Sequence, residues 1–160
     1  MTEFFECLLQ IQSWIKRLLE DPLTEILWKN SHLSKTQLET FLIDSLSEII
    51  TGKIFKYEEK AKLRLNNVVI SRGSFNRTLK QAKNNINKSI NTILLLGYLG
   101  IFKTPQLQPF LEISNRLNIY IKNYKSLWNK QKTERIENEK IEEIVLIKNE
   151  LEECLKELFS

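Results

Sequence analysis

The stretch that decides the fold runs from Ser71 to Ile93 and has the sequence SRGSFNRTLKQAKNNINKSINTI. Its apolar side chains recur at the 3–4 spacing of one helical face, namely Phe75, Leu79, Ala82, Ile86, Ile90 and Ile93. The opposite face has no carboxylate. It is made of basic and amide side chains, namely Arg77, Gln81, Asn84, Lys88 and Asn91, flanked by Lys80, Asn85 and Asn87. This pattern predicts a helix from Ser71 or Ser74 to about Leu96, ended by Gly97 and Gly100, with one side buried and the other side basic.

Helical spacing and helix-start signals extend through the rest of the chain. Asp21-Pro22 supplies an N-cap followed by proline at the first helical position, and Ser34 with Gln37 forms a capping box. Glycine (4) and proline (3) are too few among 160 residues for a turn-rich β fold. We therefore expect an all-α chain, a multi-helix bundle with a long C-terminal helix. The further helices are expected at about residues 3–20, 22–28, 34–52, 57–65, from 104 onward and 133–158.

Composition excludes several classes of protein. Cys7 and Cys154 lie near opposite ends, His32 is the one histidine, and Asp21 and Asp44 are the two aspartates. This set lacks the spacing of a metal site or a disulfide framework. The sequence contains no phosphate loop and no carboxylate pair. We expect a protein that is not an enzyme and that takes no cofactor, metal ion or small-molecule ligand.

Charge is concentrated in the middle third of the chain. Residues 51–100 carry ten Lys/Arg and two Asp/Glu, a net charge of +8, against −4 for residues 1–50 and zero for residues 101–160. All ten bases fall between Lys53 and Lys88. A local field of one sign favours a polyanionic partner, so we expect segment 53–88 to bind double-stranded DNA.

The side chains of this segment suit recognition of a duplex. Arg pairs with guanine, Asn and Gln pair with adenine, and Lys neutralises phosphate, while a helix N-terminus offers free amides to phosphate. The residues expected to contact DNA are Lys60, Arg64, Ser71, Arg72, Ser74, Asn76, Arg77, Lys80, Gln81, Asn84 and Lys88.

Two stretches of this segment together resemble helix-turn-helix DNA-binding proteins. They are Tyr57-Glu-Glu-Lys-Ala61-Lys-Leu-Arg64 and Ile70-Ser-Arg-Gly-Ser-Phe75-Asn-Arg77-Thr-Leu79. Ala61 matches the small residue where the two helices cross, and Phe75 and Leu79 match the buried anchors of the recognition helix. The resemblance implies a transcriptional regulator or a nucleoid-associated factor whose second helix enters the major groove. Ala61 and Ser71 are ten positions apart, more than in the tight motif, so the turn is either enlarged or absent.

We expect residues 1–160 to form one domain. Residues 1–52 hold the N-terminal helices, residues 53–100 the basic helix-turn-helix-like core, and residues 104–160 a C-terminal scaffold. A homodimer is expected, since two recognition helices can read a two-fold site, and either terminal region could form it. The last helix carries a 4–3 apolar pattern interrupted by Lys148, made of Ile141, Ile144, Leu151, Leu155 and Leu158.

The sequence also bears on localisation, and it leaves two alternative functions open. The longest apolar run, Ile93–Phe102, is about half the length of a membrane span, and Glu3 and Glu6 stand where a signal peptide is basic. We expect a cytoplasmic, nucleoid-associated protein without a membrane partner. The alternatives are an interaction subunit that docks an acidic protein and an RNA-binding protein. The scarcity of aromatic residues in the basic segment disfavours single-stranded RNA.

Overall fold

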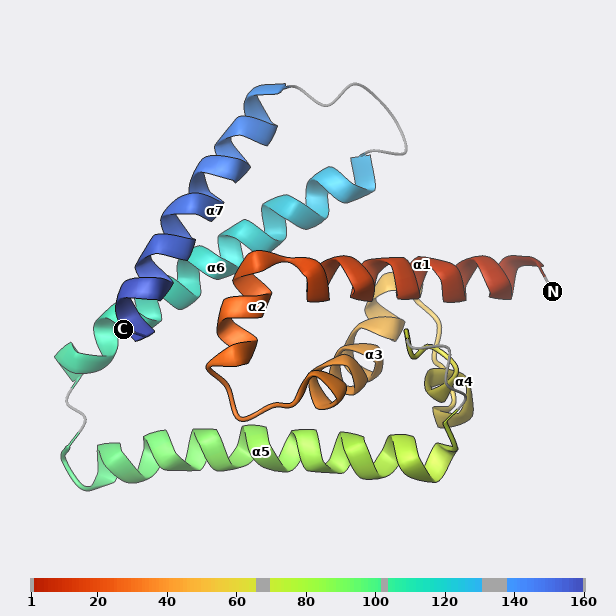
Figure 1. Ribbon diagram of the computed structural model, residues 1–160, viewed down its shortest axis with the longest axis horizontal. Helices are drawn as coiled ribbons and strands as arrows, with labels where there is room; N and C mark the ends of the chain where they lie inside the picture. The colour runs from red at the N-terminus through yellow and green to blue at the C-terminus, as the bar shows by residue number, and fades with distance from the viewer. Residues whose placement is uncertain (1, 66–69, 102–103, 131–137, 160) are drawn as a thin grey trace. The chain divides into compact units, whose positions relative to one another are not determined.

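Seven α-helices, and no strand, occur among residues 2–65, 70–101, 104–130 and 138–159, which the computed structural model describes. This confirms the expectation of an all-α chain. The helices are α1 (Thr2–Glu20), α2 (Pro22–Lys29), α3 (Lys35–Thr51), α4 (Tyr57–Ala61), α5 (Arg72–Tyr98), α6 (Thr104–Lys130) and α7 (Asn138–Phe159), as Figure 1 shows. The chain divides into two compact units, residues 1–93 and 94–160. The expectation of a single domain stays a prediction.

Local signals position the helix ends as the sequence predicts. The Asp21 carboxylate accepts a hydrogen bond from the Thr24 amide at 2.9 Å, and Pro22 follows at the first helical position. Ser34 and Gln37 form the reciprocal capping box, with bonds of 3.2 and 3.0 Å. Gly52 ends α3 with a φ of 66°, a left-handed conformation that glycine adopts without steric cost. The starts of α2 and α3 and the end of α3 are therefore confirmed.

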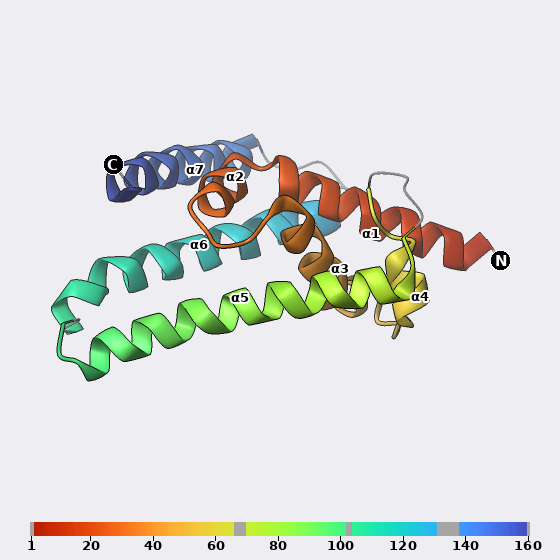
Figure 2. The same cartoon turned by 60° about the horizontal axis from the view of Figure 1, so that its bottom comes forward.

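The first unit is built around α3, which lies between α1 and the first part of α5 in both views (Figures 1 and 2). Side chains from α1, α3, α5 and the intervening segments form its core, namely Ile11, Ile15, Ile43, Phe55, Ala61, Leu63, Phe75 and Leu79. Phe75 and Leu79 were predicted to be buried, and they are. Their burial fixes the rotation of α5 about its own axis, so the opposite face of that helix points to solvent.

The apolar stripe of α5 is longer than the core that covers it. Phe75, Leu79 and Ala82 are buried, but Ile90 and Ile93 are about half exposed, at 50% and 49%. The sequence predicted both isoleucines on the buried face, and this prediction is wrong. Periodicity identifies which side of a helix is apolar, but it does not show where the neighbouring elements end.

Helix α4 is shorter than predicted, and this affects the helix-turn-helix interpretation. It ends at Ala61 instead of Leu65, and the Leu65 amide donates at 2.7 Å to the Glu39 carboxylate of α3 instead of continuing the helix. Ten residues, 62–71, join α4 to α5, whereas a tight helix-turn-helix has a turn of three or four. Ala61 is nevertheless buried, and the Tyr57 ring lies 6.4 Å from the Phe75 ring. The two helices are in contact without the tight turn.

The second unit contains the antiparallel pair α6 and α7. An exposed ion pair joins the two helices at 2.7 Å between Arg116 and Glu150. The side chains described as buried in this unit are Tyr120, Leu151 and Leu155. Helix α6 begins at Thr104, as the Thr104-Pro105 pair predicts. Residues 133–137 of the predicted last helix lie outside the described residues, and α7 covers the remainder.

Candidate nucleic-acid interface

Five of the eleven predicted contact residues form one exposed face of α5. Arg77, Lys80, Gln81, Asn84 and Lys88 are all exposed, and at 100° per residue they fall within an arc of about 100°. From the first to the last, the helix rises about 16 Å. We call these five residues the basic face of α5. This face lies opposite Phe75, Leu79 and Ala82. Because the core buries those three side chains, the basic face is exposed to solvent.

The charge of this face is not balanced by any carboxylate that the structure describes. Among the side chains that the structure describes, no carboxylate lies within 4.0 Å of the charged nitrogens of Arg77, Lys80 or Lys88. Exposed helices commonly pair Lys with Glu at i,i+4, and such pairs occur in α1, α2 and α7. The basic face of α5 therefore keeps its positive charge available to an external anion.

Lys60 and Arg64 are placed differently from the prediction. The Lys60 ammonium is 2.8 Å from the Asp44 carboxylate, also donates to the Asp44 carbonyl at 3.3 Å, and has a side chain only 14% exposed. Arg64 is 9% exposed and contacts α3, with Nε 3.2 Å from Glu39 and a guanidinium bond of 2.8 Å to the Thr40 hydroxyl. These two cations hold the α4 segment on α3, and we remove both from the contact surface.

Asp44 links this internal network to α5. Its carboxylate accepts from Lys60 at 2.8 Å and from Lys83 at 2.9 Å, so one acidic side chain of α3 is shared by cations from two elements. Partial burial raises the pKa of Asp44, but hydrogen bonds from Lys60 and Lys83, together with their charges, outweigh this and lower the pKa. Lys83 thus anchors α5, while the neighbouring Lys80 points to solvent.

The start of α5 is capped, and the residues predicted to contact DNA near this end differ in their exposure and in their partners. The Ser71 hydroxyl accepts from the Ser74 amide at 3.1 Å, which makes Ser71 the N-cap, and both serines are exposed. Arg72 lies 3.6 Å from Glu58, with both side chains more than 60% exposed, so this pair is weak. Asn76 is half-buried, and its buried amide oxygen has no hydrogen-bond partner among the described residues. Asn76 is therefore not part of the basic face of α5.

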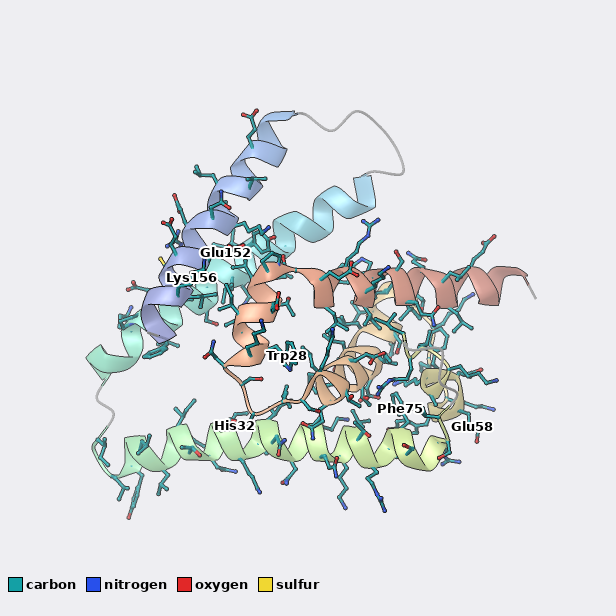
Figure 3. All side chains as sticks on the ribbon, viewed as in Figure 1. Trp28, His32, Glu58, Phe75, Glu152 and Lys156 are labelled. Atoms are coloured by element: carbon teal, nitrogen blue, oxygen red, sulfur yellow. The ribbon has the colours of Figure 1, made fainter. Side chains whose placement is uncertain are left out.

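A residue that sequence reasoning missed lies beside the basic face. His32 lies in the loop between α2 and α3, next to α5 (Figure 3). It shares an open hollow of about 290 Å³ with Asn85, Lys88, Ser89 and Thr92. The Asn85 amide donates to the His32 carbonyl at 2.9 Å, and this bond holds the loop against α5. No sequence signal joins His32 to Lys88, because the loop contact depends on the packing of α3 against α5.

Comparison of the chain with protein-family models, with curated proteins and with solved structures finds no match. In the described ranges, no group of three or more His, Cys, Asp or Glu could hold a metal ion. No helix within those same ranges is long and apolar enough to cross a membrane. A functional assignment therefore depends on the chain's own side chains.

Proposed function

We propose that this protein binds double-stranded DNA through the basic face of α5. One observation carries the proposal: Arg77, Lys80 and Lys88 share an exposed helical face with Gln81 and Asn84, and no described carboxylate neutralises them. Lys and Arg supply affinity by displacing counterions from phosphate, and Gln and Asn can pair with adenine edges. Both kinds of side chain belong to one rigid element that is anchored in a core.

The dimensions of the basic face suit the major groove. A helix with its side chains is about 10–12 Å wide, and the major groove of B-DNA is about 12 Å wide. The basic face extends for about 16 Å, or about five base-pair steps. Arg72, whose exposed pair with Glu58 is weak, lies at the start of the same helix.

The aromatic residues favour a duplex over a single strand. Proteins that bind single strands stack bases on exposed aromatic rings. In the basic segment, Phe55 and Phe75 are buried at 6% and 0% exposure, and the Lys60 ammonium lies 5.5 Å from the centre of the Tyr57 ring. The segment therefore has no row of exposed rings on which bases could stack, and this favours duplex DNA over single-stranded RNA.

The biological role follows from whether binding depends on sequence. The amides of Gln81 and Asn84 are suited to base edges, which a transcriptional regulator needs, whereas Arg77, Lys80 and Lys88 would serve a nucleoid-associated factor equally well. A selection of bound fragments from a random duplex pool separates the two roles. An enriched motif indicates a regulator, and its absence indicates a packaging role.

The proposal is tested by fluorescence anisotropy with a labelled mixed-sequence duplex. At 0.1 M salt one phosphate contact contributes about eightfold to affinity, so Arg77→Ala and Lys80→Ala should each weaken binding by about that factor. Lys16→Ala is the matched control, since it removes an exposed lysine of α1 outside the interface. Equal affinity of all four proteins would refute the site. Stronger binding to single-stranded RNA would favour the RNA alternative, and absence of nucleic-acid binding would favour an acidic protein partner.

A further inference from the structure

Beyond the basic face, α5 ends in a segment that is apolar on every side. Residues 93–96 are Ile, Leu, Leu and Leu, and after Gly97 come Tyr98, Leu99, Gly100 and Ile101. At 100° per residue the four side chains of residues 93–96 point around the whole circumference of the helix, and Leu99 and Ile101 follow directly after its last residue, Tyr98. A helix that is apolar all round is normally enclosed by protein.

The structure leaves this segment in solvent. Five of its large side chains are more than half exposed, namely Leu94 64%, Leu95 55%, Tyr98 87%, Leu99 56% and Ile101 58%, whereas Leu96 is half-buried. We call these five residues the apolar end of α5. A Cβ added at Gly97 or at Gly100 would meet no atom within 4 Å, so the two glycines also stand open.

The exposed area is that of an interface. With about 200 Å² for a fully exposed large apolar residue, the apolar end of α5 exposes roughly 640 Å², and Ile90 and Ile93 of the same helix raise this to roughly 840 Å². The largest apolar patch on a typical monomer is about 300–600 Å², whereas a stable complex buries about 800 Å² on each partner. This one segment therefore supplies about the area that each chain of a stable dimer contributes.

We propose that the apolar end of α5 packs against the same segment of a second copy of this chain. A two-fold contact buries the same residues on both chains, so each copy supplies the apolar surface that the other copy needs. A membrane surface fits less well, because a helix lying in the interface keeps one polar face in water, and this segment has none. The contact lies at the end of α5, whereas the sequence pattern favours the terminal regions for dimerisation.

Sedimentation velocity of the full chain between about 1 and 100 µM tests the proposal. The wild type should sediment as a dimer of about 38 kDa, twice the chain mass of 19.0 kDa. The double variant Leu95→Glu/Tyr98→Glu should be monomeric, with a dissociation constant raised at least 100-fold. Ile54→Glu is the matched control, because Ile54 is 84% exposed in the segment between α3 and α4 and lies outside the apolar end of α5. This control should remain dimeric.

Three results would overturn the proposal. They are a wild type that is monomeric throughout this range, a double variant that remains dimeric, and an Ile54→Glu variant that dissociates as fully as the double variant. Far-UV circular dichroism confirms that each variant is folded, and folding is expected because the substituted side chains are exposed. Binding of a monomeric wild type to phosphatidylglycerol vesicles would assign the segment to a membrane surface instead. Dimerisation is measured without DNA, so its outcome is separate from that of the proposed function.

Discussion

Arg64→Ala distinguishes a structural cation from a DNA contact. Arg64 was predicted to contact DNA, but its side chain is 9% exposed and faces Glu39, which is itself 6% exposed. The Nε–Oε2 contact of 3.2 Å is an ion pair whose geometry falls short of a hydrogen bond, and the 2.8 Å bond to the Thr40 hydroxyl fixes the guanidinium. Alanine would leave the Glu39 carboxylate buried with the Leu65 amide as its remaining described partner.

Removing one partner of a buried ion pair costs about 3–5 kcal/mol, and the imperfect alignment here favours about 3 kcal/mol. A unit of 93 residues has a total free energy of unfolding of about 5–14 kcal/mol, so the loss is a large fraction of it. In urea, with an m-value of about 1.5 kcal/mol/M, the unfolding midpoint should fall by about 2 M. Arg77→Ala, which changes an exposed side chain without a described ion pair, should shift the midpoint by less than about 0.3 M.

The assay is urea unfolding followed by far-UV circular dichroism, combined with DNA anisotropy on the folded variants. Arg64→Ala should lower stability and leave the affinity of the folded protein for DNA within about twofold of the wild type. An unchanged midpoint together with an eightfold loss of DNA affinity would place Arg64 on the DNA surface and refute its assignment to the interior.

Three further predictions concern α3 and α5. Because the pKa of Asp44 is lowered in the folded state, its contribution to stability is present above the unfolded-state pKa and is lost as pH falls through the folded-state pKa. Asp44→Asn should therefore lower the free energy of unfolding by about 2 kcal/mol at pH 7. Its stability should also decrease less in acid than that of the wild type, as measured by urea midpoints at a series of pH values. Ser34→Ala should cost about 1 kcal/mol through loss of the capping box, measured by the same unfolding assay. Lys83→Ala should destabilise the protein by about 1 kcal/mol with little effect on DNA affinity. Lys80→Ala should weaken DNA binding with little effect on stability.

Each of these predictions has a result that contradicts it. An Asp44→Asn protein with the same acid sensitivity as the wild type would show that another carboxyl group controls it. An unchanged unfolding midpoint in Ser34→Ala would show that the capping box does not stabilise α3. Similar DNA affinities for Lys80→Ala and Lys83→Ala would show that the basic face of α5 is not the contact surface.

Much of the fold follows from local sequence signals. The caps at Asp21 and Ser34 and the stop at Gly52 depend on residues within one helical turn of each other, so they could be predicted without tertiary information. The basic face of α5 could be predicted for the same reason, because Phe75 and Leu79 define the opposite side of the helix.

The errors concern contacts between segments distant in sequence. The clustering of ten basic residues in one segment does not reveal that Lys60 contacts Asp44, 16 residues earlier, or that Arg64 contacts Glu39. Helix α3 also buries Glu39, Thr40 and Ser47, a polar set that apolar periodicity overlooks, because the cation that compensates the carboxylate comes from another segment. The same limitation hid the position of His32 beside Lys88.

The salt dependence of duplex binding tests the central claim most directly. Three phosphate contacts from Arg77, Lys80 and Lys88 predict a slope of about −2.7 in log affinity against log salt for each chain, which is about a 40-fold loss between 50 and 200 mM. Arg77→Ala/Lys80→Ala should reduce the slope to about −0.9 and the loss to about 3.5-fold, while Lys16→Ala should match the wild type. No binding by the wild type at 50 mM, or the same slope for the double variant as for the wild type, would contradict the account.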